Sequence, residues 1–291
     1  MSLSVGQRLL GIAAMIAAMG AFSAMHATAK WLTGSYPASE ILFFRSLFGL
    51  LPILAMLPHQ GGIQALRTGR LGAQLLRAAY GVANLLLLFS AVAVLSLADV
   101  TAIAFTGTLF VTALSVPLLG EAVGPRRWSA VLVGFAGAMV IIRPGLGGLG
   151  PAAGLAVGAA FFYALIVLST RRLTRTESTP ALAFYYSLFG AILSCAGLPF
   201  GWIVPSATDL GLFAMLGAFA GLGALLMAAA YRRLAVATAV PFEYTALLWA
   251  ALYGFVFWGN LPDGYTLIGA GLLIASGLYV LGREVRTPPG G

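Results

Sequence analysis

The sequence predicts an all-α polytopic membrane protein whose ten transmembrane helices form two inverted five-helix repeats. Of its 291 residues, 60% are hydrophobic and only 8% are charged, whereas soluble proteins carry about 25% charged residues. Apolar runs of about 18 residues or more, long enough to span a bilayer as a helix, recur along the chain. The two halves also resemble each other at a fixed offset. A β-barrel would instead show alternating segments of about ten residues.

Ten apolar segments are separated by short stretches rich in turn-forming residues. Such stretches are "GSYP" at 34–37, "PHQGG" at 58–62, "GEAVGP" at 120–125, "RPGLGGLGP" at 143–151 and "GNLPDG" at 259–264. The first segment lacks a small-residue cleavage site and continues for a full span, so we expect a helix and not a removed signal. The expected helices cover residues 9–31, 38–57, 71–94, 98–118, 127–142, 151–171, 180–203, 209–231, 236–258 and 264–282.

The basic residues predict the orientation in the membrane. Ten spans place both termini on one side, and the loops on that side hold twelve arginines: Arg8, Arg67, Arg70, Arg126, Arg127, Arg171, Arg172, Arg175, Arg232, Arg233, Arg283 and Arg286. The opposite loops hold only Lys30 and Arg143. Cytoplasmic loops are enriched in Lys and Arg, so we expect both termini in the cytoplasm and the chain in the bacterial inner membrane. This topology explains the net charge of +8 without a nucleic-acid partner.

The repeat is visible at an offset of 139 residues. The segment "LSLADVTA" (95–102) falls on "LAVATAVP" (234–241), and Gly120 falls on Gly259. Because each half has an odd number of helices, the second half must enter the membrane in the opposite sense. Inverted repeats of this kind are typical of secondary transporters, with a substrate site near the midplane between the halves. The expected repeats are residues 1–147 and 148–291.

Three short motifs carry a resemblance to a known family. They are "FFRS" early in the second helix, "PLLGE" at the end of the fourth and "GAGLLIASG" in the tenth. With ten helices in two halves, the chain over about residues 9–283 resembles the EamA-type transporters of the drug/metabolite transporter superfamily. The resemblance implies secondary transport of small metabolites by alternating access. The aromatic-rich spans are similar to those of bacterial exporters of aromatic amino acids and paraquat. The second half departs from the motif at Asn260, which replaces the glutamate of "GE".

A set of mostly aromatic residues near mid-depth forms the candidate substrate-binding site. Rings with a few amides and hydroxyls suit amphipathic metabolites, although lipid-facing or core aromatics are the alternative. Asn84 lies one turn beyond Tyr80 on the same helix face. The candidate residues are Phe22, Tyr80, Asn84, Phe105, Tyr163, Tyr244 and Trp249.

Arg45 interrupts the apolar second segment. It lies about 10 Å below the expected outer end of the helix, where an arginine costs about 3 kcal/mol or more. The structural interpretation has Arg45 bonding helix-end carbonyls, Glu40 or Asp99. The functional interpretation makes it a vestibule charge that attracts or holds a substrate carboxylate. We favour the structural one.

Arg77 and Glu243 lie at similar depths from the expected inner side. We favour a buried ion pair that closes the inner gate. The alternative is that Glu243 carries protons and couples them to transport.

The sequence supplies little for catalysis or for a cofactor. It has two histidines and one cysteine, no H-E-x-x-H, no Cys/His cluster and no phosphate-binding G-x-x-x-x-G-K-[ST] motif, so we expect neither a metal nor a cofactor and a transporter driven by gradients. The expected function is export of amino acids, aromatic ones included, and related metabolites. The alternatives are uptake or exchange of a larger metabolite, such as S-adenosylmethionine or a nucleotide sugar, and an integral membrane enzyme. A monomer already contains both halves of the pathway.

Overall fold

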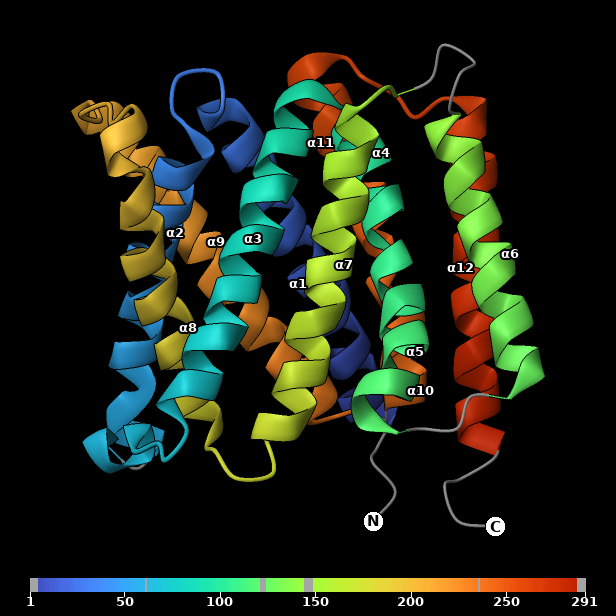
Figure 1. The fold of residues 1–291 in the computed structure, drawn as a ribbon, viewed down its shortest axis with the longest axis horizontal. Coiled ribbons are helices and arrows are strands. Elements are labelled where there is room, and N and C mark those ends of the chain that lie inside the picture. Colours follow the sequence, from blue (N-terminus) through green and yellow to red (C-terminus); the bar gives the residue numbers. More distant parts are fainter. Residues whose placement is uncertain (1–4, 61, 121–123, 144–148, 235, 287–291) are drawn as a thin grey trace.

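The computed structural model describes residues 5–60, 62–120, 124–143, 149–234 and 236–286 (Figure 1). Over these residues every regular element is a helix, which confirms the expected all-α class. Short 3₁₀ helices lie at Leu57–Gln60, Gly62–Leu66 and Cys195–Phe200. The α-helices are α1 (Val5–Leu32), α2 (Ala38–Met56), α3 (Leu71–Val94), α4 (Leu97–Ala104), α5 (Thr106–Leu119), α6 (Pro125–Ile142), α7 (Ala152–Leu173), α8 (Thr179–Ser194), α9 (Ala207–Tyr231), α10 (Val236–Glu243), α11 (Thr245–Trp258) and α12 (Gly264–Arg286).

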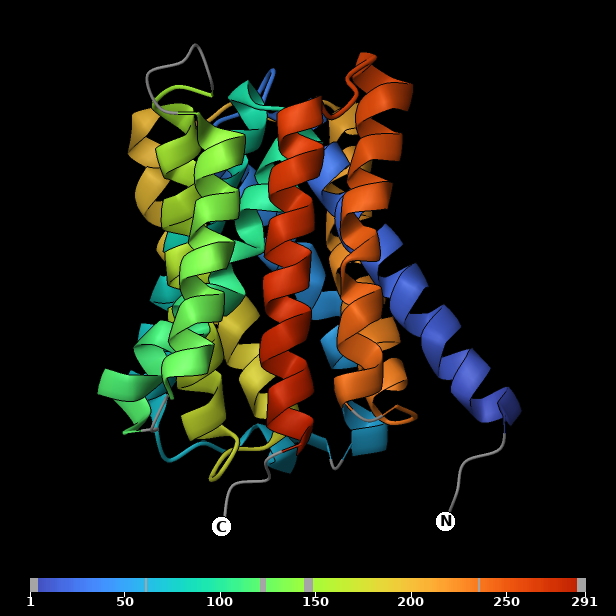
Figure 2. The same cartoon turned by 90° about the vertical axis from the view of Figure 1, so that its right-hand side faces the viewer.

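The described residues contain seven segments that are long and apolar enough to cross a membrane. They correspond to α1, α2, α3, α4 with α5, α7, α8 and α9. The remaining expected segments are also helical, as α6, α10 with α11, and α12. In Figures 1 and 2, α1 begins and α12 ends at the same end of the bundle, called the lower end below. The count of ten spans and the cytoplasmic placement of the termini stay predictions.

The helices form a closed ring with one pair outside it. Around the ring, each neighbour contacts the next in the order α1, α9, α2, α8, α3, α7, α4 with α5, α11, and back to α1. Helices α6 and α12 pack against each other beside α4 and α5, at the right-hand edge of Figure 1. The ring takes helices alternately from both halves of the chain, so its interior lies between the halves.

Small residues let neighbouring helices approach closely. A Cβ atom added at Gly137 of α6 would lie 2.8 Å from the backbone oxygen of Gly269 in α12, and one added at Gly269 would lie 2.5 Å from the oxygen of Gly137. In the ring, a Cβ atom added at Gly217 of α9 would lie 2.4 Å from the Cβ of Phe48 in α2. Because lipid provides no hydrophobic drive for helix association, such van der Waals packing holds membrane helices together.

Two expected helices are broken, which corrects the prediction of continuous helices over 98–118 and 236–258. The first breaks at Phe105, between α4 and α5, and the second at Tyr244, between α10 and α11. After each break a threonine hydroxyl donates to the carbonyl three residues earlier, Thr106 to Ile103 at 2.7 Å and Thr245 to Phe242 at 2.6 Å. These bonds accompany a tightened turn at each break.

The two breaks lie at equivalent positions of the two repeats. Phe105 and Tyr244 are 139 residues apart, as are α4 and α10 from first residue to first residue. The broken helices also end alike, because Gly120 and Gly259 both cap them in the left-handed conformation, with φ of 69° and 67°. The expected helix over 180–203 is shorter as well, because α8 ends at Ser194 and a 3₁₀ turn containing Pro199 follows.

Candidate functional site

The two broken helices meet where their breaks lie. The rings of Phe105 and Tyr244 are in edge-to-face contact, with centroids 4.9 Å apart, and α4 packs against α11. The Tyr244 hydroxyl lies against Gly277 of α12, where an added Cβ would be 2.0 Å from its oxygen. The candidate residues Phe105 and Tyr244, one from each half, therefore form the contact between the two broken helices, which is called the crossing below.

A lysine closes the upper end of the ring. Lys30, at the end of α1, donates to the carbonyls of Val92 at 2.5 Å and Leu95 at 2.6 Å at the end of α3. Its Nζ also lies 5.6 Å from the ring centroid of Trp258 in α11. These bonds satisfy helix-end carbonyls and join α1 to α3 across the ring.

The hydrogen bonds of Lys30 have no counterpart at the lower end. At the repeat offset, the counterparts of α1 and α3 are α7 and α9, and between the described residues of these two helices there is no such hydrogen bond and no extensive packing. The bridge that Lys30 makes between α1 and α3 therefore has no equivalent among the described residues of α7 and α9.

Glu243 lies beside the break and is surrounded by phenols. Tyr231 of α9 donates a hydrogen bond to its carboxylate, and Tyr163 and Tyr244 interact with the same charge. Among the described residues, no cation pairs with Glu243. A carboxylate at membrane depth without a cation is a typical proton-transfer group.

The structure does not bring Arg77 and Glu243 together as an ion pair. Arg77 donates instead to the carbonyl of Leu182 in α8, and its guanidinium carbon lies 5.1 Å from the ring centroid of Tyr186. The sequence predicts a similar depth for both residues, but depth alone does not say which side of a helix faces which neighbour. A gating or coupling role for either residue stays a prediction.

Arg45 lies inside the ring. It interacts electrostatically with His26 of α1 and with the Tyr186 hydroxyl of α8. Its Nε is buried without a hydrogen-bond partner. Neither Glu40 nor Asp99 bonds to it, because Glu40 accepts from the backbone N–H of Ile203 and Asp99 bonds to Ser96 and Thr266.

The other candidate residues lie on neighbouring faces of the ring helices. The Tyr80 ring is 6.3 Å from that of Phe162, and the Asn84 amide donates to the carbonyl of Ala159 at 2.7 Å. Both contacts join α3 to α7. Phe22 of α1 packs against Gly223 of α9.

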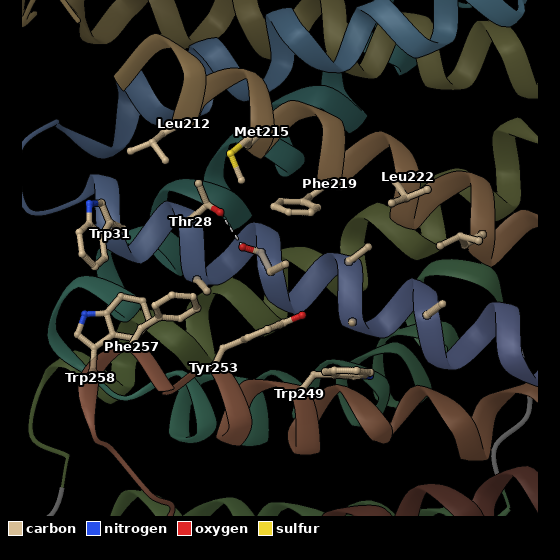
Figure 3. A pocket seen from close by; sticks show the side chains of 16 residues that line it. Thr28, Trp31, Leu212, Met215, Phe219, Leu222, Trp249, Tyr253, Phe257 and Trp258 are labelled. Atoms are coloured by element: carbon tan, nitrogen blue, oxygen red, sulfur yellow. Dashed lines mark hydrogen bonds between the residues drawn. The ribbon is translucent and has the colours of Figure 1, made fainter. Parts of the chain in front are cut away.

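A separate groove of about 660 Å³ runs along the other side of α1 (Figure 3). Helix α1 forms its floor and α9 and α11 its walls, and Trp249 is the one candidate residue in its lining. Successive helical residues are about 100° apart, so His26, two residues from the lining Ala24 and Thr28, points to the opposite side of α1. The groove therefore opens outside the ring.

Polar groups in the groove are largely satisfied within the protein. The Thr28 hydroxyl donates to the carbonyl of Ala24 at 2.9 Å, and the Trp249 indole N–H donates to that of Ile16 at 3.1 Å. Trp249 also stacks on Tyr253, with centroids 5.9 Å apart. These contacts give Trp249 a structural part in holding α11 on α1.

At the upper surface, an exposed ion pair links the two halves. Arg143 follows α6 and lies 2.8 Å from the carboxylate of Asp263, just before α12. The backbone N–H of Thr266 donates to the same carboxylate at 2.8 Å. This hydrogen bond, with the charge of Arg143, holds the pKa of Asp263 below its ordinary value.

Comparison with known proteins decides the family. The model of the EamA-like transporter family matches the chain twice, over residues 9–143 and 150–282. The chain belongs to the EamA-like transporter family. The expected repeat boundary at 147/148 lies between the two matches.

Similar curated proteins extend over nearly the whole chain. A riboflavin transporter of Rhizobium johnstonii is 29% identical over 281 residues, 96% of this chain and 93% of the relative. A pseudopaline exporter of Pseudomonas aeruginosa is 29% identical over 281 residues, covering 95% and 97%. An S-adenosylmethionine uptake transporter of Rickettsia bellii is 27% identical over 283 residues, covering 95% of each chain.

A solved crystal structure has the same fold. It matches 98% of this chain and 100% of its own, with a TM-score of 0.65 and 19% identity. With the family and the apolar helices, these findings identify a multi-pass membrane transporter of the bacterial inner membrane. The relatives' names do not single out the aromatic amino acid and paraquat branch.

Four residues of the site were not among the candidate site residues: Lys30, Tyr231, Tyr186 and His26. Lys30 had a signal, because it is the only lysine in the chain and ends an apolar span. The other three lack a motif, since their importance comes from which neighbour each helix face meets.

Proposed function

We propose that the protein moves a ring-bearing, amphipathic metabolite through the interior of the ring by alternating access, driven by an ion gradient. The observation that carries this proposal is a bridge at one of two related ends. Lys30 joins α1 to α3 at the upper end, whereas no equivalent hydrogen bond joins the described residues of α7 and α9 at the lower end. If the lower end is cytoplasmic, as the arginines predict, this is the inward-facing state.

The inverted repeat supplies the second state. In an inverted-repeat transporter each half can adopt the conformation of the other, which exchanges the open and closed ends. The counterpart of Lys30 is Ser169, and that of Val92 is Tyr231. In the outward-facing state, Ser169 of α7 would therefore approach the lower end of α9, while Lys30 would leave α3.

The rings at the crossing favour a substrate with a flat apolar body. Phe105 and Tyr244 present ring edges and faces at the point where the halves meet, and such rings prefer stacked or edge-on partners. Relatives named as transporters of riboflavin and of S-adenosylmethionine support the larger metabolite, the alternative raised by the sequence. Export of amino acids, aromatic ones included, is the second candidate; the relative named as an exporter supports the direction.

Glu243 is the proposed coupling residue. It has a tyrosine and no cation as its partner, and it immediately precedes the break at Tyr244. Protonation would remove the charge beside the crossing and change the balance between the two states. This replaces the inner-gate pair with Arg77 as the favoured interpretation.

Transport into proteoliposomes tests the proposal. The purified full chain would be assayed with radiolabelled riboflavin, S-adenosylmethionine, tryptophan and alanine, with and without an imposed pH gradient. We expect saturable flux of at least one ring-bearing solute, and more of it than of alanine. Flux of alanine alone would reject the ring-bearing substrate, and the absence of flux for every solute would reject transport of this class.

A further inference from the structure

Two arginines inside the protein lack an acidic partner. The Nε atoms of Arg45 and Arg77 are both buried without a hydrogen-bond partner. Arg77 is 6% exposed, and its one hydrogen bond within the described structure goes to a neutral carbonyl, that of Leu182. No hydrogen bond or ion pair to a described residue involves Arg45.

The six carboxylates whose side chains the structure describes have other partners. The partners are Ile203 N–H for Glu40, Ser96 and Thr266 for Asp99, Gln74 for Glu177, Tyr36 and Ser206 for Asp209, Tyr231 for Glu243, and Arg143 for Asp263. Of the positive charges inside the ring, Lys30 is bound to carbonyls at the upper end. The two arginines thus keep an excess of positive charge between α2, α3 and α8.

Tyr186 connects the two arginines. Its ring lies against Arg77, and its hydroxyl interacts electrostatically with both guanidinium groups. The ring occupies the space above Gly81 of α3, where an added Cβ would be only 2.4 Å away. His26 of α1 interacts electrostatically with Arg45. Four helices from both halves therefore contribute to one polar cluster, defined here as Arg45, Arg77, Tyr186 and His26.

The cluster lies away from both ends of the helices that hold its arginines. Arg45 is seven residues from the upper start of α2, and Arg77 is six residues from the lower start of α3, or about 10 Å from each end. An arginine without a partner is unfavourable at such depth in a membrane. A ligand that neutralises it regains part of this cost.

The geometry points to an anion-binding site: the cluster binds the acidic group of the transported solute, with Arg45 as its main contact and Arg77 and Tyr186 beside it. A guanidinium group binds carboxylate or phosphate through two parallel N–H donors. This inference rests on the proposed transport function and adds that the substrate carries a carboxylate or a phosphate besides its ring.

Paired probes with and without an acidic group test the site. The carboxylate arm compares tryptophan with tryptophanamide, and the phosphate arm compares flavin mononucleotide with riboflavin. Binding to the detergent-purified full chain would be measured by thermal shift and flux in proteoliposomes. We expect the acidic member of at least one pair to bind about tenfold more tightly or better, as for hydrogen bonds to charged groups. Equal binding within both pairs would overturn the inference.

Variants assign the effect to the arginine. Arg45→Gln should weaken binding of the acidic probe much more than binding of the neutral probe, so that the preference is lost, while Arg45→Lys should retain part of it. Arg143→Gln removes an arginine that already has an acidic partner at the surface, so it should change neither probe. A folded Arg45→Gln protein with the full preference would overturn the inference. If that variant does not fold, the comparison with Arg45→Lys decides, because a lysine without the bidentate fork must weaken the preference.

The two proposals fail in different ways. Acid-selective binding without flux of any probe would reject transport of these solutes and leave the anion site standing. Flux without acid selectivity would reject the anion site alone.

Discussion

At the residue scale, three charges on the helices share one feature: each has a specific, uncharged set of neighbours. Lys30 donates to helix-end carbonyls, and Glu243 accepts a hydrogen bond from a tyrosine hydroxyl. Arg77 donates to a carbonyl and lies against a tyrosine ring. The one ion pair among the described residues, Arg143 with Asp263, lies at the surface. Charges that are not neutralised by each other remain available to a substrate or a proton.

Glu243→Gln should abolish transport driven by a pH gradient while leaving exchange at equal pH intact. The amide keeps the size of the side chain but cannot carry a proton, so the coupling step is lost and the pathway is kept. The readout is proteoliposome flux with and without a gradient. Asp99→Asn is the matched control, because Asp99 is bonded at the upper end of the ring. Gradient-driven flux at the parent's level in Glu243→Gln would exclude this residue as the coupling site.

Asp263 should contribute a small, acid-sensitive part of the stability. Its pKa is held down in the folded protein, chiefly by the Thr266 N–H and further by Arg143. The contribution is therefore present above the unfolded pKa of about 3.9 and is lost as pH falls through the lower folded value. Because the pair is exposed, Asp263→Asn should lower the melting temperature by only about 1–2 °C at pH 7. The difference from the parent should vanish in strong acid; a difference that grows as pH falls would contradict this assignment.

At the element scale, the broken helices are the feature that the repeat duplicates most closely. Both break after an aromatic residue, both use a threonine hydroxyl at the break, and both end at a left-handed glycine. A break frees backbone groups from the regular helix ladder, and in a membrane such groups are tolerated only inside protein or beside water. The breaks therefore indicate the inside of the pathway more directly than hydropathy does.

Gly120→Ala and Gly259→Ala should each destabilise the protein by about 1–2 kcal/mol, because alanine resists the left-handed conformation. Neither position has an atom within 4 Å of an added Cβ, so the loss is conformational and not steric. Gly271→Ala in α12 also meets no atom but lies within a helix, so it should be neutral or stabilising by up to about 1 kcal/mol. Detergent unfolding curves of the three variants give the comparison. Equal effects at all three sites would show that the left-handed backbone conformation is not the cause of the destabilisation.

At the scale of the whole molecule, the helical segments were predictable and their mutual orientation was not. Hydropathy and turn residues place α3 at 71–94, the range observed, because an apolar run in a membrane has few alternatives to a helix. The breaks at Phe105 and Tyr244 leave that apolar pattern intact, so nothing in the composition reveals them. The separation of Arg77 from Glu243 depends on how neighbouring helices are rotated, which packing decides.

The last prediction concerns the two states of the ring. Lys30→Gln removes the charge that holds α1 to the end of α3, so the balance should move toward the state in which α7 approaches α9. Spin labels at Ser169 and Arg232, in a Cys195→Ala background that removes the chain's single cysteine, report the distance between the lower ends of these helices. The parent should give mainly the longer distance, and Lys30→Gln should add a shorter one. Lys30→Arg, which keeps a donor for the same carbonyls, should resemble the parent. An unchanged distance distribution in Lys30→Gln would mean that Lys30 only stabilises the fold and does not hold the upper end closed.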